Sequence, residues 1–130
     1  LSPDALSRMH SPLVSTPPRC RRGPMDRAFS QVSYGLGWRS MTYAGRTLVG
    51  HRGWVDGYGS LVLFDPVDQS GIVMLWNSNT GKPGRLQLEF FDMLYALPFT
   101  DWLELPAEPV EPSAPTVAEG GSQAHDTREG

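Results

Sequence analysis

Two runs of consecutive apolar residues, LVLF at 61–64 and IVMLW at 72–76, constrain the fold of this chain more than any other feature. The residues between them, DPVDQSG, have the composition of a turn, so the two runs predict neighbouring strands. A strand with one face in water alternates apolar and polar residues, and these two runs do not alternate. Both faces of the sheet that they form therefore need cover.

Two further segments extend the predicted sheet. The segment YGLGWRSMTY (34–43) predicts a strand with glycine gaps, and residues 46–52 predict its partner across a hairpin turn at Ala44-Gly45. With the two apolar runs extended to 58–64 and 72–77, the sheet has about four strands, and all joins are short. The sequence therefore predicts an α+β fold built on an antiparallel meander.

A C-terminal helix is predicted to cover one face of this sheet. Residues 83–97 have helical periodicity, with a proline at the first position and another just after the last. We expect one apolar face of this helix to pack on the sheet: Leu86, Phe90, Met93, Leu94 and Leu97. A shorter helix is predicted from Ser2-Pro3-Asp4 to about Met9, followed by a long loop over 12–31. Because so few helices are available, we expect that a covering layer lies outside this chain.

The last residues differ in amino-acid composition from the rest of the chain. In 106–130, proline recurs at every third position at first, acidic residues dominate and apolar residues are scarce. We therefore expect a folded unit over 1–105 and a disordered acidic tail over 106–130. The net charge of −3 and the lack of a basic patch argue against a nucleic-acid partner. No apolar run is long enough to predict a transmembrane segment, and the single cysteine excludes an intrachain disulfide.

The stretch GHRGWVDGYGS (50–60) is the candidate site. Four glycines surround a histidine, an arginine and two kinds of aromatic residue, and glycine lets a ligand or a second backbone come close. Strand alternation places His51 and Gly53 on one face and Arg52 on the other. The alternative interpretation is an ordinary strand corner with a buried, hydrogen-bonded histidine.

The order of these segments resembles the C-terminal part of the serine β-lactamase-like superfamily. That superfamily includes class C β-lactamases, penicillin-binding proteins and family VIII esterases. The matching segments span about residues 1–97: Tyr34-Gly35-Leu36-Gly37-Trp38, Gly50-His51-Arg52-Gly53, Gly57-Tyr58-Gly59-Ser60 and Gly71 through Asn77. The resemblance implies a β-lactamase-like α/β sandwich and a hydrolase that works through an acyl-enzyme.

The resemblance also implies roles for three residues. His51-Arg52-Gly53 stands where the family carries K-T-G or H-x-G on the edge strand beside its active site. It implies that His51 holds a substrate carboxylate or orients the proton network, and that Gly53 admits substrate backbone. Trp54 would give a backbone N–H to the oxyanion hole. The arginine at 52 and the bulky Trp54 depart from the family pattern, which favours an ester or peptide substrate over a classical β-lactam.

The nucleophile of that family is missing from these residues. The chain has one lysine, Lys82, and Asn79 stands three residues before it, so no S-x-x-K occurs. No tyrosine is followed two residues later by asparagine, and Tyr58-Gly59-Ser60 follows the His51 segment instead of preceding it. We therefore expect a C-terminal fragment that is inactive alone. The expected partners are the missing N-terminal part of the same domain and, in the full-length parent, a small-molecule or peptide substrate, with no cofactor and no metal.

Two other functions fit the same residues. A stand-alone binding module would use the glycine-rich edge to hold a peptide or a second copy, with the acidic tail as a tether. A split enzyme would need a second chain to complete its site. The family resemblance favours an exported or periplasmic bacterial location.

Overall fold

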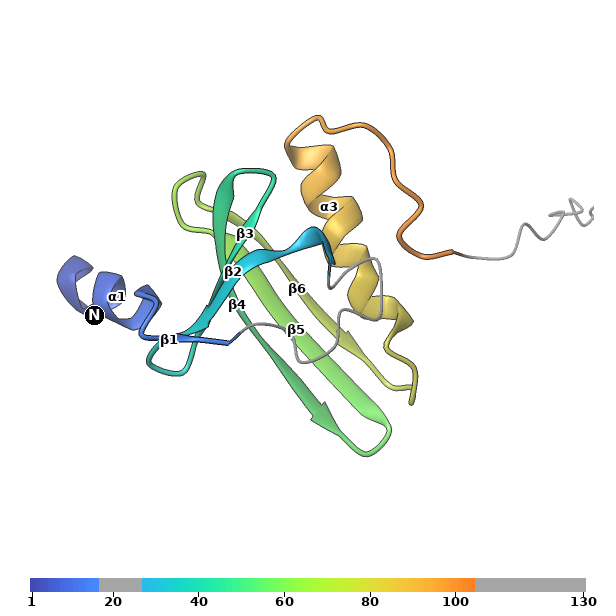
Figure 1. Cartoon of the computed structure of the whole chain (residues 1–130). Coiled ribbons are helices and arrows are strands. Elements are labelled where there is room, and N and C mark those ends of the chain that lie inside the picture. Colours follow the sequence, from blue (N-terminus) through green and yellow to red (C-terminus); the bar gives the residue numbers. More distant parts are fainter. Residues whose placement is uncertain (17–26, 105–130) are drawn as a thin grey trace, which may run out of the picture.

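The computed structural model describes residues 1–16 and 27–104, which form one six-stranded antiparallel sheet flanked by short helices (Figure 1). The helical elements are α1 (Pro3–His10), the 3₁₀ turn η1 (Lys82–Arg85) and α3 (Leu86–Leu94). The strands are β1 (Val14–Ser15), β2 (Ser30–Tyr34), β3 (Arg39–Tyr43), β4 (Arg46–Val55), β5 (Tyr58–Asp65) and β6 (Ser70–Trp76). Their order in the sheet is their order in the chain, so the predicted antiparallel meander is confirmed.

The number of strands is higher than the four expected. The predicted strand over 34–43 is the last residue of β2, a turn and the whole of β3, because Gly35 and Gly37 bend the chain between the two strands. Gly37 has φ of +81°, which glycine adopts without strain. A Cβ on Gly35 would lie 2.8 Å from the carbonyl oxygen of Met9, so the turn packs tightly against the end of α1. The predicted loop 12–31 contains β1 and the first residues of β2, and its residues 17–26 lie outside the described ones.

The helix start predicted at Ser2 and the hairpin turn predicted at Ala44-Gly45 are both confirmed. Ser2 caps α1, since its hydroxyl accepts a 3.2 Å hydrogen bond from the N–H of Ala5. Ala44 and Gly45 have φ of +47° and +77° and join β3 to β4. Two residues with positive φ are what a two-residue turn matched to strand twist requires.

The helix that follows β6 is shorter than predicted and turns a different face to the sheet. The predicted helix over 83–97 is η1 followed by α3, which ends at Leu94. Leu88 and Phe91 are fully buried, whereas Met93 of the predicted apolar face is 83% exposed. The predicted face is therefore wrong for Leu86, Met93 and Leu94, which are exposed, whereas Phe90 and Leu97 pack against the core as predicted. Two polar residues, Gln87 and Asp92, lie beside Leu88 and Phe91 on the buried face.

Hydrogen bonds explain why those polar residues are tolerated. The Gln87 side-chain amide donates to the carbonyl of Gly84 at 2.7 Å. Asp92 accepts from the Tyr43 hydroxyl and, at 2.7 Å, from the indole N–H of Trp102. Buried polar groups with partners of this kind cost little. Burial, together with the nearby Asp92 carboxylate, raises the pKa of Tyr43.

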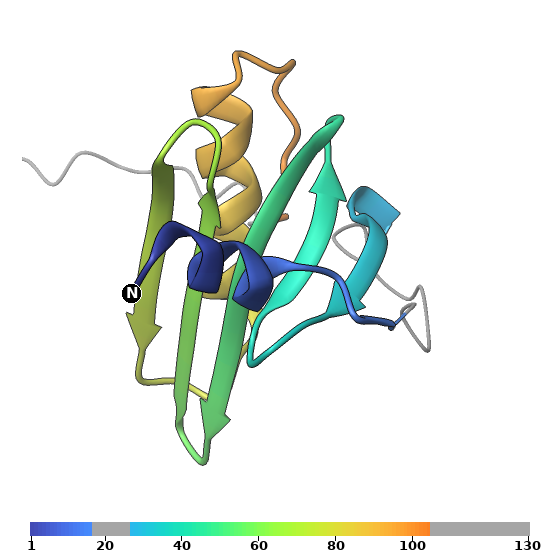
Figure 2. The same cartoon turned by 90° about the vertical axis from the view of Figure 1, so that its left-hand side faces the viewer.

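The main core lies between α3 and one face of the sheet. It consists of Phe29, Tyr43, Leu48, Leu61, Leu63, Leu88 and Phe91. Figure 2 shows α3 behind the sheet and α1 in front of it, so the two helices lie on opposite faces. The α1 side holds only a small cluster, in which the ring of His10 packs edge-on against Trp38 and Phe64.

Much of the α1 face is uncovered. Along β6, Val73 and Leu75 are 69% and 80% exposed, while Ile72, Met74 and Trp76 face α3 and are half-buried. The expectation drawn from the non-alternating apolar runs is therefore met for the described residues: one face of the sheet is covered and the other is largely open. An exposed apolar sheet face of this kind marks an interaction surface.

Candidate functional site

The outer half of β4 is an open sheet edge. Residues 46–50 pair with β3, but β3 begins at Arg39, opposite Gly50, so residues 51–55 extend beyond it. On the other side, β4 pairs with β5 from Val49 to Val55. Figure 1 shows β4 and β5 running together past the ends of β2 and β3. Within the described residues, no strand pairs with the outer edge of residues 51–55, and this edge carries all three predicted site residues.

The pairing of β4, β5 and β6 fixes which face each site residue occupies. His51 pairs with Val62, which pairs with Val73. Gly53 starts the next row on the same face, followed by Ser60 and Leu75. His51 and Gly53 thus share the uncovered face with the two most exposed apolar residues of β6.

Arg52 belongs to the opposite face. It pairs with Leu61, a core residue under α3, so the alternation predicted for residues 51–53 agrees with the register. Arg52 makes further contacts of its own.

His51 has one hydrogen-bond partner that the sequence did not predict. The hydroxyl of Tyr34 lies 3.2 Å from Nε2 of His51, and the two rings meet edge to face with centroids 6.0 Å apart. With the imidazole proton on Nδ1, Tyr34 donates this bond; with the proton on Nε2, it accepts. Either way the contact limits the orientation of an exposed imidazole. His51 is not the buried histidine of the alternative interpretation, because it is exposed.

Gly53 lies close to the side chain of Ser60. A Cβ at this position would collide with the side-chain oxygen of Ser60, its partner across the strands. The close approach that glycine permits here is therefore already used by Ser60. Admission of substrate backbone along this edge stays a prediction.

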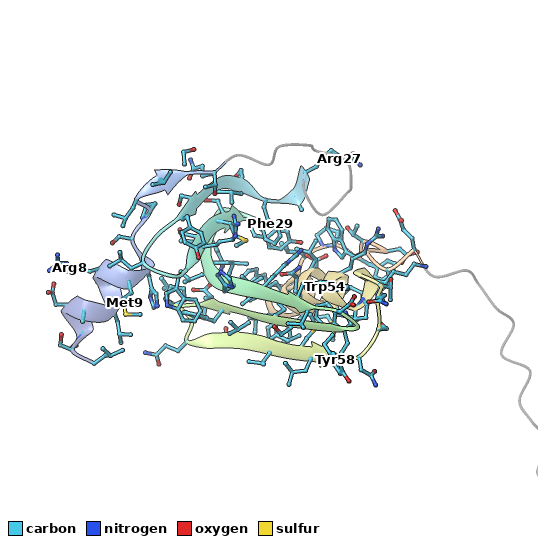
Figure 3. All side chains as sticks on the ribbon, turned by 90° about the horizontal axis from the view of Figure 1, so that it is seen from below. Arg8, Met9, Arg27, Phe29, Trp54 and Tyr58 are labelled. Atoms are coloured by element: carbon cyan, nitrogen blue, oxygen red, sulfur yellow. The ribbon has the colours of Figure 1, made fainter. Side chains whose placement is uncertain are left out.

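Trp54 lies at the far end of the hairpin on the α3 side of the sheet. Its indole packs edge-on against Trp76 with ring centroids 6.1 Å apart, and the residue is 52% exposed. Figure 3 shows Trp54 on the α3 side and Tyr58 on the opposite side of the same hairpin. The predicted oxyanion role concerns the backbone N–H of Trp54 and stays a prediction. The side chain itself contacts Trp76, which packs against the core.

Among residues 1–16 and 27–104, no three His, Cys, Asp or Glu side chains gather in a way that could hold a metal ion. In the same residues, no helix has the length and apolarity needed to cross a bilayer. The predicted tail, 106–130, lies outside the described residues.

Comparison with known protein families gives a match over most of the chain. A family model described as Beta-lactamase matches residues 3–96, from the first residue of α1 to just beyond α3. The match covers every described strand, the His51 edge included. No curated protein and no solved structure matches the chain.

Proposed function

Because the chain belongs to the beta-lactamase family, we propose that it is the C-terminal part of the catalytic domain of a serine hydrolase. In the proposed parent enzyme, a serine oxygen adds to the carbonyl carbon of an ester or amide while a neighbouring base takes its proton. The leaving group departs with a proton, and water then hydrolyses the acyl-enzyme. The serine and its base belong to residues outside this chain, since no S-x-x-K occurs in it.

One observation carries this proposal: His51 and Gly53 lie on the uncovered face of the sheet, in rows with Val73 and Leu75. Those two side chains are mostly exposed, so the described residues leave this part of the face open. A layer that covered them would also bring its own residues to His51 and to the open edge of β4. A further part of the domain would thus explain both the exposed sheet face and the missing nucleophile.

The three edge residues have separate proposed roles. His51, held by Tyr34, binds a substrate carboxylate or passes protons. The N–H of Trp54 stabilises the oxyanion of the tetrahedral intermediate, a contribution of about 10²–10³ in rate. Gly53 has no side chain and so leaves room for the substrate backbone along the strand. The arginine and tryptophan around Gly53 favour an ester or peptide substrate over a β-lactam.

The size and reactivity of the native protein test this proposal. An antiserum against residues 106–130 is applied to lysate of the source cells after treatment with a fluorophosphonate probe. We expect a band several times larger than 14.3 kDa that carries the probe, because the full domain contains the serine. A band at 14.3 kDa without the probe would overturn the proposal and favour a stand-alone binding module or one half of a split enzyme.

Variants of that larger protein then test the edge. His51→Ala should lower kcat/KM about 10²-fold, since it removes a residue that contacts the substrate or its protons. Arg52→Ala, at the adjacent position on the opposite face, is the matched control and should change kcat/KM much less. Equal losses in the two variants would mean that the edge matters for folding and has no site role.

A further inference from the structure

We propose that a cavity on the α3 side of the sheet binds a monocarboxylate with a short apolar chain, such as a medium-chain fatty acid. The cavity encloses about 380 Å³ and is bordered by β2, β3, β4, β5 and the first turn of α3. His51 and Arg52 of β4 also line it, so the cavity adjoins the edge that carries the candidate site. The proposal concerns binding in this cavity and does not require hydrolase activity.

The cavity walls suit an alkyl chain. They are mainly apolar and come from four strand or pre-strand segments: Phe29, Val32, Met41, Leu61 and Leu63. Its volume is at the small end of the range of about 300–1,000 Å³ that is typical of small-molecule sites. Water in such an apolar space finds few hydrogen-bond partners, so a short apolar chain displaces it favourably.

The charge at the cavity selects the head group. Arg39 lines it and is exposed, with its guanidinium stacked 5.3 Å from the ring centroid of Tyr34. Within the described residues, Arg39 forms no ion pair, and no Asp or Glu lines the cavity. Arg39 pairs with Gly50, which has no side chain to separate the guanidinium from the cavity floor. A guanidinium at the rim of an apolar space matches a carboxylate, which it can bind through two parallel hydrogen bonds.

A buried hydroxyl supplies a second polar contact. Thr16 lines the cavity, and its side-chain oxygen is buried and has no hydrogen-bond partner among the described residues. Its backbone N–H donates 2.8 Å to the carbonyl of Val32, which fixes the residue beside β2. A buried hydroxyl without a partner is costly, and a carboxylate oxygen in the cavity would accept its hydrogen.

Photolabelling of the complete 130-residue chain tests the site. The probe is octanoate with a terminal diazirine, and the labelled peptides are mapped by mass spectrometry. We expect labelling of cavity residues on β2, β3 and β5. Octanoate should compete with the probe, octanol should need at least about ten-fold higher concentration because it lacks the charge, and octylamine should not compete. Labelling of Val73 or Leu75, or equal competition by octanol, would overturn the proposal.

Three variants distinguish charge-dependent binding of octanoate from non-specific hydrophobic binding. Arg39→Gln should raise the competing concentration of octanoate about ten-fold, equivalent to about 1.4 kcal/mol, and Thr16→Val should raise it several-fold. Arg8→Gln is the matched control, because Arg8 is an exposed arginine on α1 at the other face, and it should change nothing. An unchanged value for Arg39→Gln would contradict the proposal. If that variant does not fold by circular dichroism, the octanoate, octanol and octylamine series on the unmodified chain decides.

Discussion

Asp65 accepts a 2.6 Å hydrogen bond from the hydroxyl of Tyr95, thirty positions further along the chain. This bond joins the end of β5 to the end of α3. The other carboxylate oxygen accepts from the backbone N–H groups of Val67 and Asp68 and so closes the turn before β6. Arg46 on β4 completes the group, with its guanidinium 3.3 Å from Asp65 and stacked over the Tyr95 ring.

Asp65→Asn should destabilise the fold by about 2–3 kcal/mol. The amide keeps the shape of the side chain but loses the charge, and one of its two terminal atoms can no longer accept the bonds that the carboxylate accepts. Hydrogen bonds to a buried charged group are worth more than those to a neutral group. Urea unfolding followed by tryptophan fluorescence measures the change.

Asp68→Asn is the matched control. Asp68 forms an ion pair with the same Arg46, but its side chain is 39% exposed, so the loss should stay below about 1 kcal/mol. Equal losses for the two variants would mean that the effect comes from the Arg46 ion pairs and not from the buried hydrogen bonds of Asp65.

The free energy of unfolding should be constant near neutral pH and fall at both extremes. Burial favours the neutral form of Asp65, but hydrogen bonds, first from Tyr95 and then from the turn backbone, outweigh it and lower the pKa. The unfolded chain therefore binds more protons as pH falls through about 4, and stability is lost there. Burial, followed by the bond to Asp65, raises the pKa of Tyr95, so stability is lost as pH rises above about 10.

Unfolding midpoints measured from pH 3 to pH 11 check the predicted losses of stability on the acid limb and on the alkaline limb of this pH dependence. Tyr95→Phe should flatten the alkaline limb in part, because Tyr43, whose pKa is raised in the same direction, still contributes. A steep alkaline limb of unchanged size in Tyr95→Phe would show that other groups cause it.

The two faces of the sheet should respond differently to the same substitution. Leu63→Ala removes a side chain that is 1% exposed in the core under α3, and should cost about 2–5 kcal/mol. Leu75→Ala removes one that is 80% exposed on the other face, and should change stability by less than about 0.5 kcal/mol. Chemical denaturation of the two variants gives the comparison. A large cost at Leu75 would mean that the chain already covers this face, for instance with a second copy.

Gly50→Ala should be poorly tolerated. A Cβ at Gly50 would collide with the carbonyl of Val62 and lie 2.7 Å from a methyl carbon of Leu63, and the neighbouring backbone cannot yield easily. We expect a cost of about 1–3 kcal/mol. Gly81→Ala is the control, because Gly81 has φ of −82° and open space around it, and should be neutral or stabilising by up to about 1 kcal/mol. A neutral result at Gly50 would contradict the close packing of β4 on β5.

Sequence reasoning succeeded where the signal is local. The Ser2 cap, the Ala44-Gly45 turn and the apolar runs each depend on neighbouring residues, and each gives the predicted element. The two-residue strand β1 was not predicted, because only its pairing with β2 defines it as a strand. On α3, the buried face was missed because partners distant in sequence satisfy its polar residues: Tyr43 donates to Asp92 from forty-nine positions away.

At the candidate edge too, the features set by neighbouring residues were predicted and the contact between distant residues was not. Alternation alone placed His51 and Gly53 on one face, and the register agrees. The contact of Tyr34 with His51 was not predicted, because it depends on the turn between β2 and β3, which lies within the segment predicted as one strand with glycine gaps. The family-typical segment that begins at Tyr34 was the available signal, since it places a tyrosine at the start of that turn.

The order of the sheet has a consequence for how the chain is made. Each strand pairs with the one synthesised just before it, so a nascent chain can add strands in turn without waiting for distant partners. The core forms later, because Leu88 and Phe91, its two fully buried helix residues, belong to α3, the last described element to leave the ribosome. Until they emerge, the sheet is as bare on the α3 side as on the other. A chain that stops before α3 therefore presents two apolar faces to the cell's chaperones instead of one.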